Sequence, residues 1–146
     1  MFGATGGLGK LLDTAPGGSH CEWVARILVI DDEAMVGLMI QRMLSPAHQV
    51  TAQLSARSAL ALVKNGERYD VIITDLHMPD GDGIWLRAEL ARVDPGAPRR
   101  MLFLTGGAGS AEAQEFLDQP GVRWLEKPFR SADLLARIED VILSGS

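Results

Sequence analysis

The sequence predicts an α/β fold in which a parallel sheet is covered by helices on both faces. Short, continuous apolar runs such as residues 27–30 and 71–73 are typical of strands that are buried on both sides. Between these runs lie segments whose apolar residues recur with the 3.6-residue period of a helix. Strands and helices therefore alternate along the chain, which is the order that builds a parallel sheet.

This alternation predicts a series of elements along the chain. Their expected bounds are strand 26–31, helix 33–45, strand 49–53, helix 56–65, strand 70–75, helix 83–93, strand 100–105, helix 110–118, strand 122–126 and helix 131–143. Ser55 and Ser131 are expected to be N-caps, because a hydroxyl can accept a backbone N–H that the first turn leaves unpaired. Pro46 and Gly66 are expected to end the helices that precede them.

Length and charge restrict the classes of protein to which the chain can belong. With 146 residues, 47% of them apolar, it has the size of one domain with one core. Its formal charge is −5 and its 14 basic residues are scattered among 19 acids, so direct nucleic-acid binding is not expected. The single cysteine, Cys21, cannot form an internal disulfide. No stretch is apolar enough to span a bilayer and no signal peptide is recognisable, so we expect no membrane insertion and a cytoplasmic location.

Residues 1–24 are expected to form a flexible N-terminal tail or linker, and residues 25–146 the folded domain. The first segment is rich in glycine and contains the run Pro16-Gly17-Gly18-Ser19. Residues 3–10 resemble the glycine spacing of a nucleotide-binding loop. Such loops follow a strand, however, and the few residues before this run cannot supply one, so we expect no nucleotide site there.

Charged residues lie at the expected carboxyl ends of three strands. Asp31 and Asp32 end the first strand, Asp75 ends the third, and Lys127 follows the fifth. Ligands of open parallel sheets bind in the crevice beyond the carboxyl ends of the strands, where the strand order reverses. The three acids and the lysine are therefore expected to form one site.

This group of side chains predicts phosphoryl chemistry. Carboxylates within about 4 Å of one another repel by several kcal/mol per pair, so the cluster must take up protons or hold a cation. Mg²⁺ prefers oxygen ligands and commonly links carboxylates to a phosphoryl oxygen. Asp75 is the expected nucleophile, with Lys127 offsetting the charge on the transferred group. The hydroxyl of Thr105, at the end of the fourth strand, is expected to donate to a phosphoryl oxygen.

The sequence resembles the receiver domain of two-component response regulators over about residues 25–143. The resemblance rests on four motifs in the family's order and spacing, which are Asp31-Asp32, Asp75-Leu76-His77-Met78-Pro79, Thr105-Gly106 and Lys127-Pro128-Phe129. It implies a flavodoxin-like (βα)5 fold with strand order 2-1-3-4-5. It also implies a cis peptide bond between Lys127 and Pro128.

The resemblance further implies the ligands of a Mg²⁺ ion. Asp32 and Asp75 would bind the metal directly, and Asp31 would act through water. The backbone carbonyl of His77 would be a further ligand. Asp75 would be the residue that is phosphorylated.

A conformational switch is also implied by the resemblance. Thr105 and Lys127 would sense the phosphoryl group. In the family the threonine acts together with an aromatic residue, usually Tyr or Phe, and the matching position here is Trp124. The larger indole group is a departure from the family pattern, so the coupling is expected to be altered.

Helix 33–45 carries more apolar residues than one core-facing stripe requires. The expected stripe consists of Val36, Met39, Ile40, Met43 and Leu44. Met35 and Leu38 lie on another face. In the family this helix docks on the helical bundle that carries the donor histidine, so these two residues are expected to face a partner. The alternative is that they are ordinary, isolated apolar residues of a protein surface.

Three functions are open at this point. The first is a working receiver that takes a phosphoryl group from a histidine kinase or a histidine phosphotransfer domain and regulates a downstream protein. The second is a degenerate receiver that only binds a protein, and the third is a Mg²⁺-dependent phosphatase of similar topology. The working receiver is favoured, because every phosphorylation residue is present and because the phosphatase would need an acid at the position of His77.

The expected protein is thus a signalling domain rather than an enzyme. Its sequence ends at Ser146, shortly after the last predicted helix. We therefore expect either a stand-alone regulator or the receiver of a hybrid sensor histidine kinase.

Overall fold

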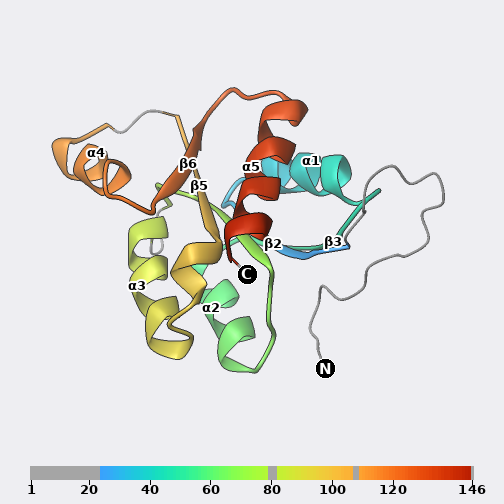
Figure 1. Cartoon of the computed structure of the whole chain (residues 1–146), viewed down its shortest axis with the longest axis horizontal. Helices are drawn as coiled ribbons and strands as arrows, with labels where there is room; N and C mark the ends of the chain where they lie inside the picture. The colour runs from blue at the N-terminus through green and yellow to red at the C-terminus, as the bar shows by residue number, and fades with distance from the viewer. Residues whose placement is uncertain (1–23, 79–81, 107–108, 146) are drawn as a thin grey trace.

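A computed structural model describes residues 24–78, 82–106 and 109–145. Parallel strands form one five-stranded sheet in this part of the chain (Figure 1). The strands are β2 (Arg26–Ile30), β3 (Gln49–Gln53), β4 (Val71–Asp75), β5 (Met101–Thr105) and β6 (Arg123–Glu126). Their order across the sheet is β3-β2-β4-β5-β6, so the predicted flavodoxin-like topology with strand order 2-1-3-4-5 is confirmed.

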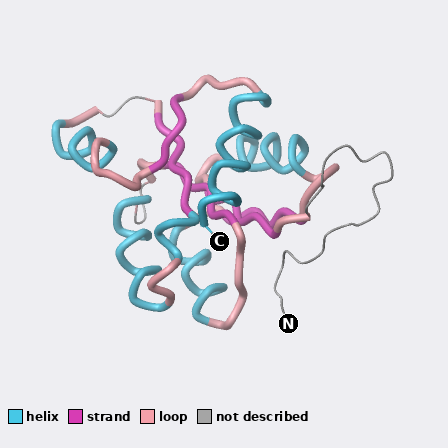
Figure 2. Tube along the Cα trace, viewed as in Figure 1, coloured by secondary structure: helices cyan, strands magenta, loops and turns pink. Residues whose placement is uncertain are grey.

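Helices cover both faces of the sheet (Figure 2). They are α1 (Ala34–Leu44), α2 (Ala56–Lys64), α3 (Gly83–Val93), α4 (Ala111–Leu117) and α5 (Ser131–Gly145), with a short 3₁₀ helix, η2 (Ala97–Arg100), before β5. Buried residues of α1 and α5 pack with one face of the strands, and those of α2, α3 and α4 pack with the other. The fold therefore has the three layers that alternating strands and helices predict.

The alternation of side chains along β2 supplies both cores. Ile27 and Val29 belong to the core beneath α1 and α5, whereas Leu28 and Ile30 belong to the core beneath α2 and α3. All four side chains are at most 1% exposed. Burial of a side chain of this size contributes roughly 1.5–3 kcal/mol, so β2 is held firmly from both sides. The position of Asp31, the residue that follows, is thereby fixed as well.

Of the two predicted caps, one is present and the other is wrong. The hydroxyl of Ser55 accepts the backbone N–H of Ser58, as expected for the N-cap of α2. Ser131, in contrast, is already the first residue of α5. The carboxylate of Asp133, in the first turn, reaches back and accepts the backbone N–H of Arg130 at 3.2 Å, which is the part of the acid in a capping box.

The predicted core-facing stripe of α1 also needs a correction. Met39 is 50% exposed, and Gly37 occupies a buried position on the helix instead. The buried residues Gly37, Ile40 and Leu44 follow the repeat of three and four residues that defines one helix face. Met39 points about 100° away from Ile40, toward solvent. The helix therefore presents one more apolar side chain to solvent than the sequence suggested.

Several predictions lie outside the described residues. They include the flexible tail up to residue 23, the glycine-rich segment 3–10 and Cys21. Among the residues that are described, no helix is both long and apolar enough to cross a membrane.

His48 connects the turn after α1 to the start of the sheet. Its Nδ1 atom accepts the backbone N–H of Ala25 at 3.1 Å, next to the point where Gln49 of β3 bonds to the carbonyl of Ala25. Burial lowers the pKa of His48 below its ordinary value of 6.5, and the nearby carboxylate of Asp70 opposes this shift in part. The fold therefore favours the neutral imidazole, which alone can accept this hydrogen bond.

The first prediction follows from the sign of this shift. Because the unfolded chain binds the proton more readily than the folded one, stability is fully present above the unfolded pKa and falls as the pH drops below about 6.5. We expect the free energy of unfolding in urea to fall more between about pH 7.5 and about pH 5.5 for the parent than for His48→Asn, which keeps an acceptor and does not titrate. Equal losses in the two proteins would contradict this role of His48.

Candidate functional site

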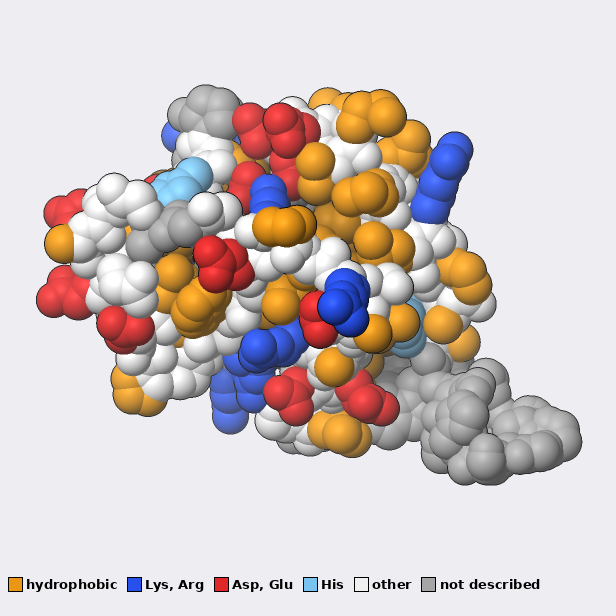
Figure 3. Space-filling model, turned by 90° about the horizontal axis from the view of Figure 1, so that it is seen from above, with side chains coloured by type: hydrophobic (Ala, Val, Ile, Leu, Met, Phe, Trp, Pro, Cys, Tyr) orange, Lys and Arg blue, Asp and Glu red, His pale blue; other side chains and the backbone are white. Residues whose placement is uncertain are grey.

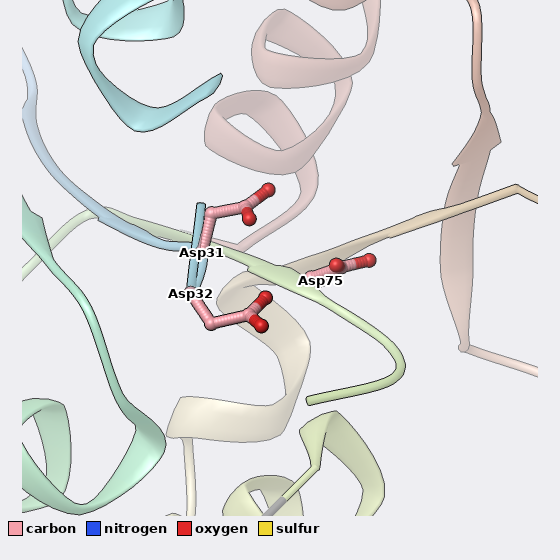
Figure 4. Close-up of side chains that lie close together, drawn as sticks. All are labelled: Asp31, Asp32 and Asp75. Atoms are coloured by element: carbon pink, nitrogen blue, oxygen red, sulfur yellow. The ribbon is translucent and has the colours of Figure 1, made fainter. Parts of the chain in front are cut away.

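Three aspartates meet at the carboxyl edge of the sheet (Figure 4). Asp31 and Asp32 follow β2, Asp75 ends β4, and these two strands are hydrogen-bonded neighbours. One carboxylate oxygen from each residue lies within 4.8 Å of the others. The structure therefore brings together the three acids that the sequence selected. Asp31 is buried, Asp75 is half-buried and Asp32 is exposed, so the cluster is open to solvent on the side of Asp32.

Lys127 reaches the same cluster from the other half of the sheet. Its Nζ atom lies 3.4 Å from Oδ1 of Asp75 and 3.7 Å from Oδ2 of Asp31. The residue follows β6, and its backbone N–H donates to the carbonyl of Thr105 at 2.7 Å. The Lys127-Pro128 peptide bond is cis, as the family resemblance implied.

The electrostatics of the cluster favour a bound cation. Burial raises the pKa of Asp75 above its ordinary value; Lys127 acts in the opposite direction, and Asp31 and then Asp32 add to the rise. Oδ1 of Asp31 accepts the backbone N–H of Glu33, whereas its Oδ2 is buried without a hydrogen-bond partner. One ammonium group thus faces three carboxylates. Hard oxygen donors in excess of the local positive charge fit a divalent ion such as Mg²⁺.

Thr105 ends the strand next to β4. In the register of the sheet Asp75 pairs with Leu104, so Thr105 lies one residue further toward the same edge. Its side chain is only 1% exposed. His77 follows Asp75 by two residues and is exposed. Both residues therefore lie at the edge of the sheet where the sequence placed them.

Residues 27–139 match the family described as the response regulator receiver domain. The chain belongs to this family. Receivers are signalling domains that bind Mg²⁺ at an aspartate cluster and interact with histidine kinases and effectors, and the grouped acids of this receiver agree with that chemistry.

Curated relatives contain the receiver as part of a longer chain. The transcriptional regulatory protein GlrR of Escherichia coli K12 is 31% identical over 116 residues, which are 80% of this receiver and 26% of GlrR. TcrA of Mycobacterium tuberculosis H37Rv is 32% identical over 121 residues, 82% of this receiver and 47% of TcrA. A protein-glutamate methylesterase/protein-glutamine glutaminase of Anaeromyxobacter dehalogenans is 33% identical over 111 residues, 75% of this receiver and 32% of that enzyme. The receiver thus spans between about a quarter and a half of these relatives.

Solved receivers share the fold over nearly their whole length. The response regulator receiver domain protein of Clostridium thermocellum has a TM-score of 0.73 and 29% identity, covering 83% of this receiver and 96% of that chain. The receiver domain of the Francisella response regulator 1452 has a TM-score of 0.70 and 27% identity, covering 84% of this receiver and 99% of that chain.

The position matched to the family's switch aromatic is half-buried. Trp124 lies on β6, opposite Phe103 in the register, and packs against the core beneath α2 and α3. Thr105 pairs instead with Glu126, two residues further along β6. Trp124 therefore faces the same core as Phe103.

The start of α3 holds two residues to which the sequence analysis gave no function. Oδ1 of Asp82 accepts the backbone N–H of Trp85 at 2.9 Å and so caps the helix. An aspartate directly before a helical pattern is the signal that would have identified this cap. At Gly83, the first residue of α3, a Cβ atom would lie 2.9 Å from the backbone oxygen of Asp75. Lack of space at one position leaves no such signal in a single sequence.

Proposed function

We propose that this receiver accepts a phosphoryl group on Asp75 from a phosphohistidine and changes conformation to regulate a partner. The observation that supports the proposal most strongly is the position of the Asp75 carboxylate, half-buried between Lys127 and two further acids. A lone carboxylate at a strand end would be an ordinary turn residue. One that faces an ammonium group and a cation site is equipped for nucleophilic attack on phosphorus.

Each residue of the cluster has a role in this transfer. An Asp75 oxygen forms the new bond to phosphorus, the bond between phosphorus and the donor imidazole breaks, and the imidazole nitrogen leaves with the bonding electron pair and is then protonated. Lys127 holds its ammonium beside Asp75 and offsets charge on the phosphoryl oxygens. The Thr105 hydroxyl donates to one of these oxygens.

We assign the Mg²⁺ ion to the carboxylates of Asp32 and Asp75 and the backbone carbonyl of His77, with Asp31 acting through water. When bound, Mg²⁺ neutralises charge that gathers on the phosphoryl group during transfer. The buried Oδ2 of Asp31 supports the assignment, because it has no hydrogen bond and the ammonium group of Lys127, 3.7 Å away, is shared with Asp75.

The two alternative functions have less support. A degenerate receiver would not need to retain the acids and the lysine in contact. A phosphatase of similar topology would need an acidic residue two residues after the nucleophile to serve as general acid, and His77 occupies that position. We therefore regard the chain as a phosphoacceptor that catalyses at most its own phosphorylation and dephosphorylation.

We place the docking surface for the phosphohistidine donor on α1. Met35 is 75% exposed and Leu38 is 42% exposed, and both follow directly on the acid cluster. Met39, 50% exposed, extends the same apolar surface. Flexible methionine side chains adapt to apolar partners at low cost, so this surface fits a helix of a kinase or a phosphotransfer domain.

The second prediction tests the nucleophile. Acetyl phosphate with Mg²⁺ is expected to add one phosphoryl group, stable in acid and labile in base, to the parent protein. Asp75→Asn removes the attacking oxygen and should abolish the gain in intact mass. Asp118→Asn, which alters an exposed carboxylate at the end of α4, is the matched control and should be labelled like the parent.

Labelling of Asp75→Asn at the parent rate would show that another residue is the nucleophile.

The same assay tests α1 when the donor is a phosphorylated histidine phosphotransfer protein. Leu38→Asp should slow this transfer about tenfold or more and leave labelling by acetyl phosphate unchanged. Val93→Asp, on a side chain that is 41% exposed at the far end of α3, is the control for an added surface charge.

The third prediction concerns the metal. Asp32→Ala should weaken Mg²⁺ binding at least about tenfold in calorimetry, because an exposed ligand is lost from an open site. Its metal-free stability should not fall, since repulsion among the acids is reduced. Glu33→Ala changes a neighbouring acid outside the cluster and should bind Mg²⁺ like the parent. Unchanged affinity in Asp32→Ala would exclude this metal site.

We propose that Thr105 and Trp124 form the switch that reports phosphorylation. A phosphoryl group brings about −1.5 to −2 charges and strong hydrogen-bond acceptors to Asp75. These acceptors draw in Lys127 and the Thr105 hydroxyl. Because the backbone N–H of Lys127 is bonded to the carbonyl of Thr105, a shift of either residue is transmitted to β6, which carries Trp124.

The fourth prediction tests this coupling. Beryllofluoride with Mg²⁺ imitates the aspartyl phosphate, so it should shift the emission of Trp124 in a variant in which Trp23 and Trp85 are changed to Phe. Asp75→Asn in the same background should show no shift. An unchanged emission together with identical conformations of residues 105–124 in both states would rule out the threonine and tryptophan route.

Three further expectations stay predictions. The cytoplasmic location rests on the sequence analysis, as does the division between a tail up to residue 24 and the receiver. Membership of a hybrid sensor kinase would require a kinase region in the same chain, and mass analysis of the protein from its source would test it.

A further inference from the structure

Gly83 has no side chain where the start of α3 rests on the phosphoacceptor strand. A Cβ atom at this position would lie 2.9 Å from the backbone oxygen of Asp75 and 3.1 and 3.2 Å from two carbon atoms of the Phe103 ring. Cβ atoms essentially never approach another heavy atom more closely than 3.0 Å. Its φ lies outside the left-handed region, so backbone conformation does not demand glycine. Space alone does.

The neighbours of Gly83 are held in place and cannot easily yield. The carbonyl oxygen of Asp75 accepts the Thr74 hydroxyl at 3.0 Å. The N–H of Gly83 donates to the carbonyl of Leu76 at 3.0 Å, which ties α3 to the end of β4. Phe103 is 1% exposed and meets Phe116 edge to face, with 5.1 Å between the ring centroids. A new methyl group would therefore displace backbone rather than the end of a flexible side chain.

We infer that Gly83 is a positioning residue for the phosphoacceptor. Its bare Cα lets the start of α3 rest against the carbonyl of Asp75 and so fixes the peptide from which the carboxylate projects. The inference rests on the proposed role of Asp75 as the nucleophile. It goes beyond that role, because it makes the amino-terminus of α3 part of the machinery that aims the carboxylate.

The geometry of the acid cluster explains why a small shift matters. The Asp75 carboxylate lies 3.4 Å from Nζ of Lys127. One of its oxygens lies within 4.8 Å of an oxygen of Asp31 and an oxygen of Asp32. Because the peptide group is planar, the carbonyl oxygen cannot move alone, and the Asp75-Leu76 peptide moves with it next to the Cα atom that carries the carboxylate. A displacement of about 1 Å at a reacting group can reduce a rate about a hundredfold.

The test compares Gly83→Ala with the parent protein in three measurements. These are the rate of labelling by acetyl phosphate at saturating Mg²⁺, the Mg²⁺ dissociation constant from calorimetry, and the urea midpoint of unfolding. We expect Gly83→Ala to be labelled at least about tenfold more slowly and to bind Mg²⁺ more weakly while folded. If it is unfolded in plain buffer, the measurements are made with trimethylamine N-oxide, which favours the compact state.

Two control variants separate displacement of Asp75 from loss of stability. Gly37→Ala adds the same methyl group in α1, where no atom lies within 4 Å of the new Cβ, and should keep the parent rate and affinity. Phe103→Val removes the ring atoms that touch Gly83 and lowers stability, but it adds nothing against the Asp75 carbonyl. It should also keep the parent rate and affinity once folded.

Each outcome decides the question. Slow labelling and weak Mg²⁺ binding confined to Gly83→Ala support the inference. Parent-like values in folded Gly83→Ala overturn it, as does an equal loss in Phe103→Val, because a loosened core would then be the cause. If the parent itself is not labelled, the proposed function fails, and the Mg²⁺ affinities of the same three variants still decide whether Gly83 positions Asp75.

Discussion

The contact of one lysine with two aspartates is the interaction on which the functional end of this receiver depends. Lys127 reaches Asp75 and Asp31 across β5, so residues from three strands converge on one point. Without the ammonium group, burial and the neighbouring acids would raise the pKa of Asp75 further. One positive charge does not balance three carboxylates. The residual imbalance is what makes the site receptive to a cation and, with it, to a phosphoryl group.

The hydrophobic layers determine where these charges lie. Since β2, β4 and β5 are buried on both faces, they cannot slide relative to one another without exposing apolar side chains. Their carboxyl ends stay in register, with Ile30 beside Thr74 and Asp75 beside Leu104. The acids are therefore arranged by the packing of residues that take no part in the chemistry. Stability is supplied by the sheet, and reactivity is confined to its edge.

The sequence predicted those features that arise from short, repeated patterns. Apolar runs and helical periods predicted the order of strands and helices, and charges at strand ends predicted which acids meet. Met39 was misassigned, because a periodic stripe on a short helix does not reveal how wide the buried face is. The 3₁₀ helix η2 and the role of Gly83 were missed for other reasons. A helix of four residues is too short to show a period, and the need for glycine at position 83 depends on how α3 meets Asp75 and Phe103 in space.

Two series of contacts connect Asp75 with the surface on the side of α4. One runs from Lys127 through the carbonyl of Thr105 into β5 and β6. In the other, Gly83 lies where a Cβ atom would meet both the carbonyl of Asp75 and the Phe103 ring, and this ring meets Phe116 of α4 edge to face. Phe103 lies on the same strand as Thr105, two residues earlier, so both series meet in β5. Whichever way the indole of Trp124 turns, the strand that carries Thr105 is already in contact with α4 through a pair of aromatic rings.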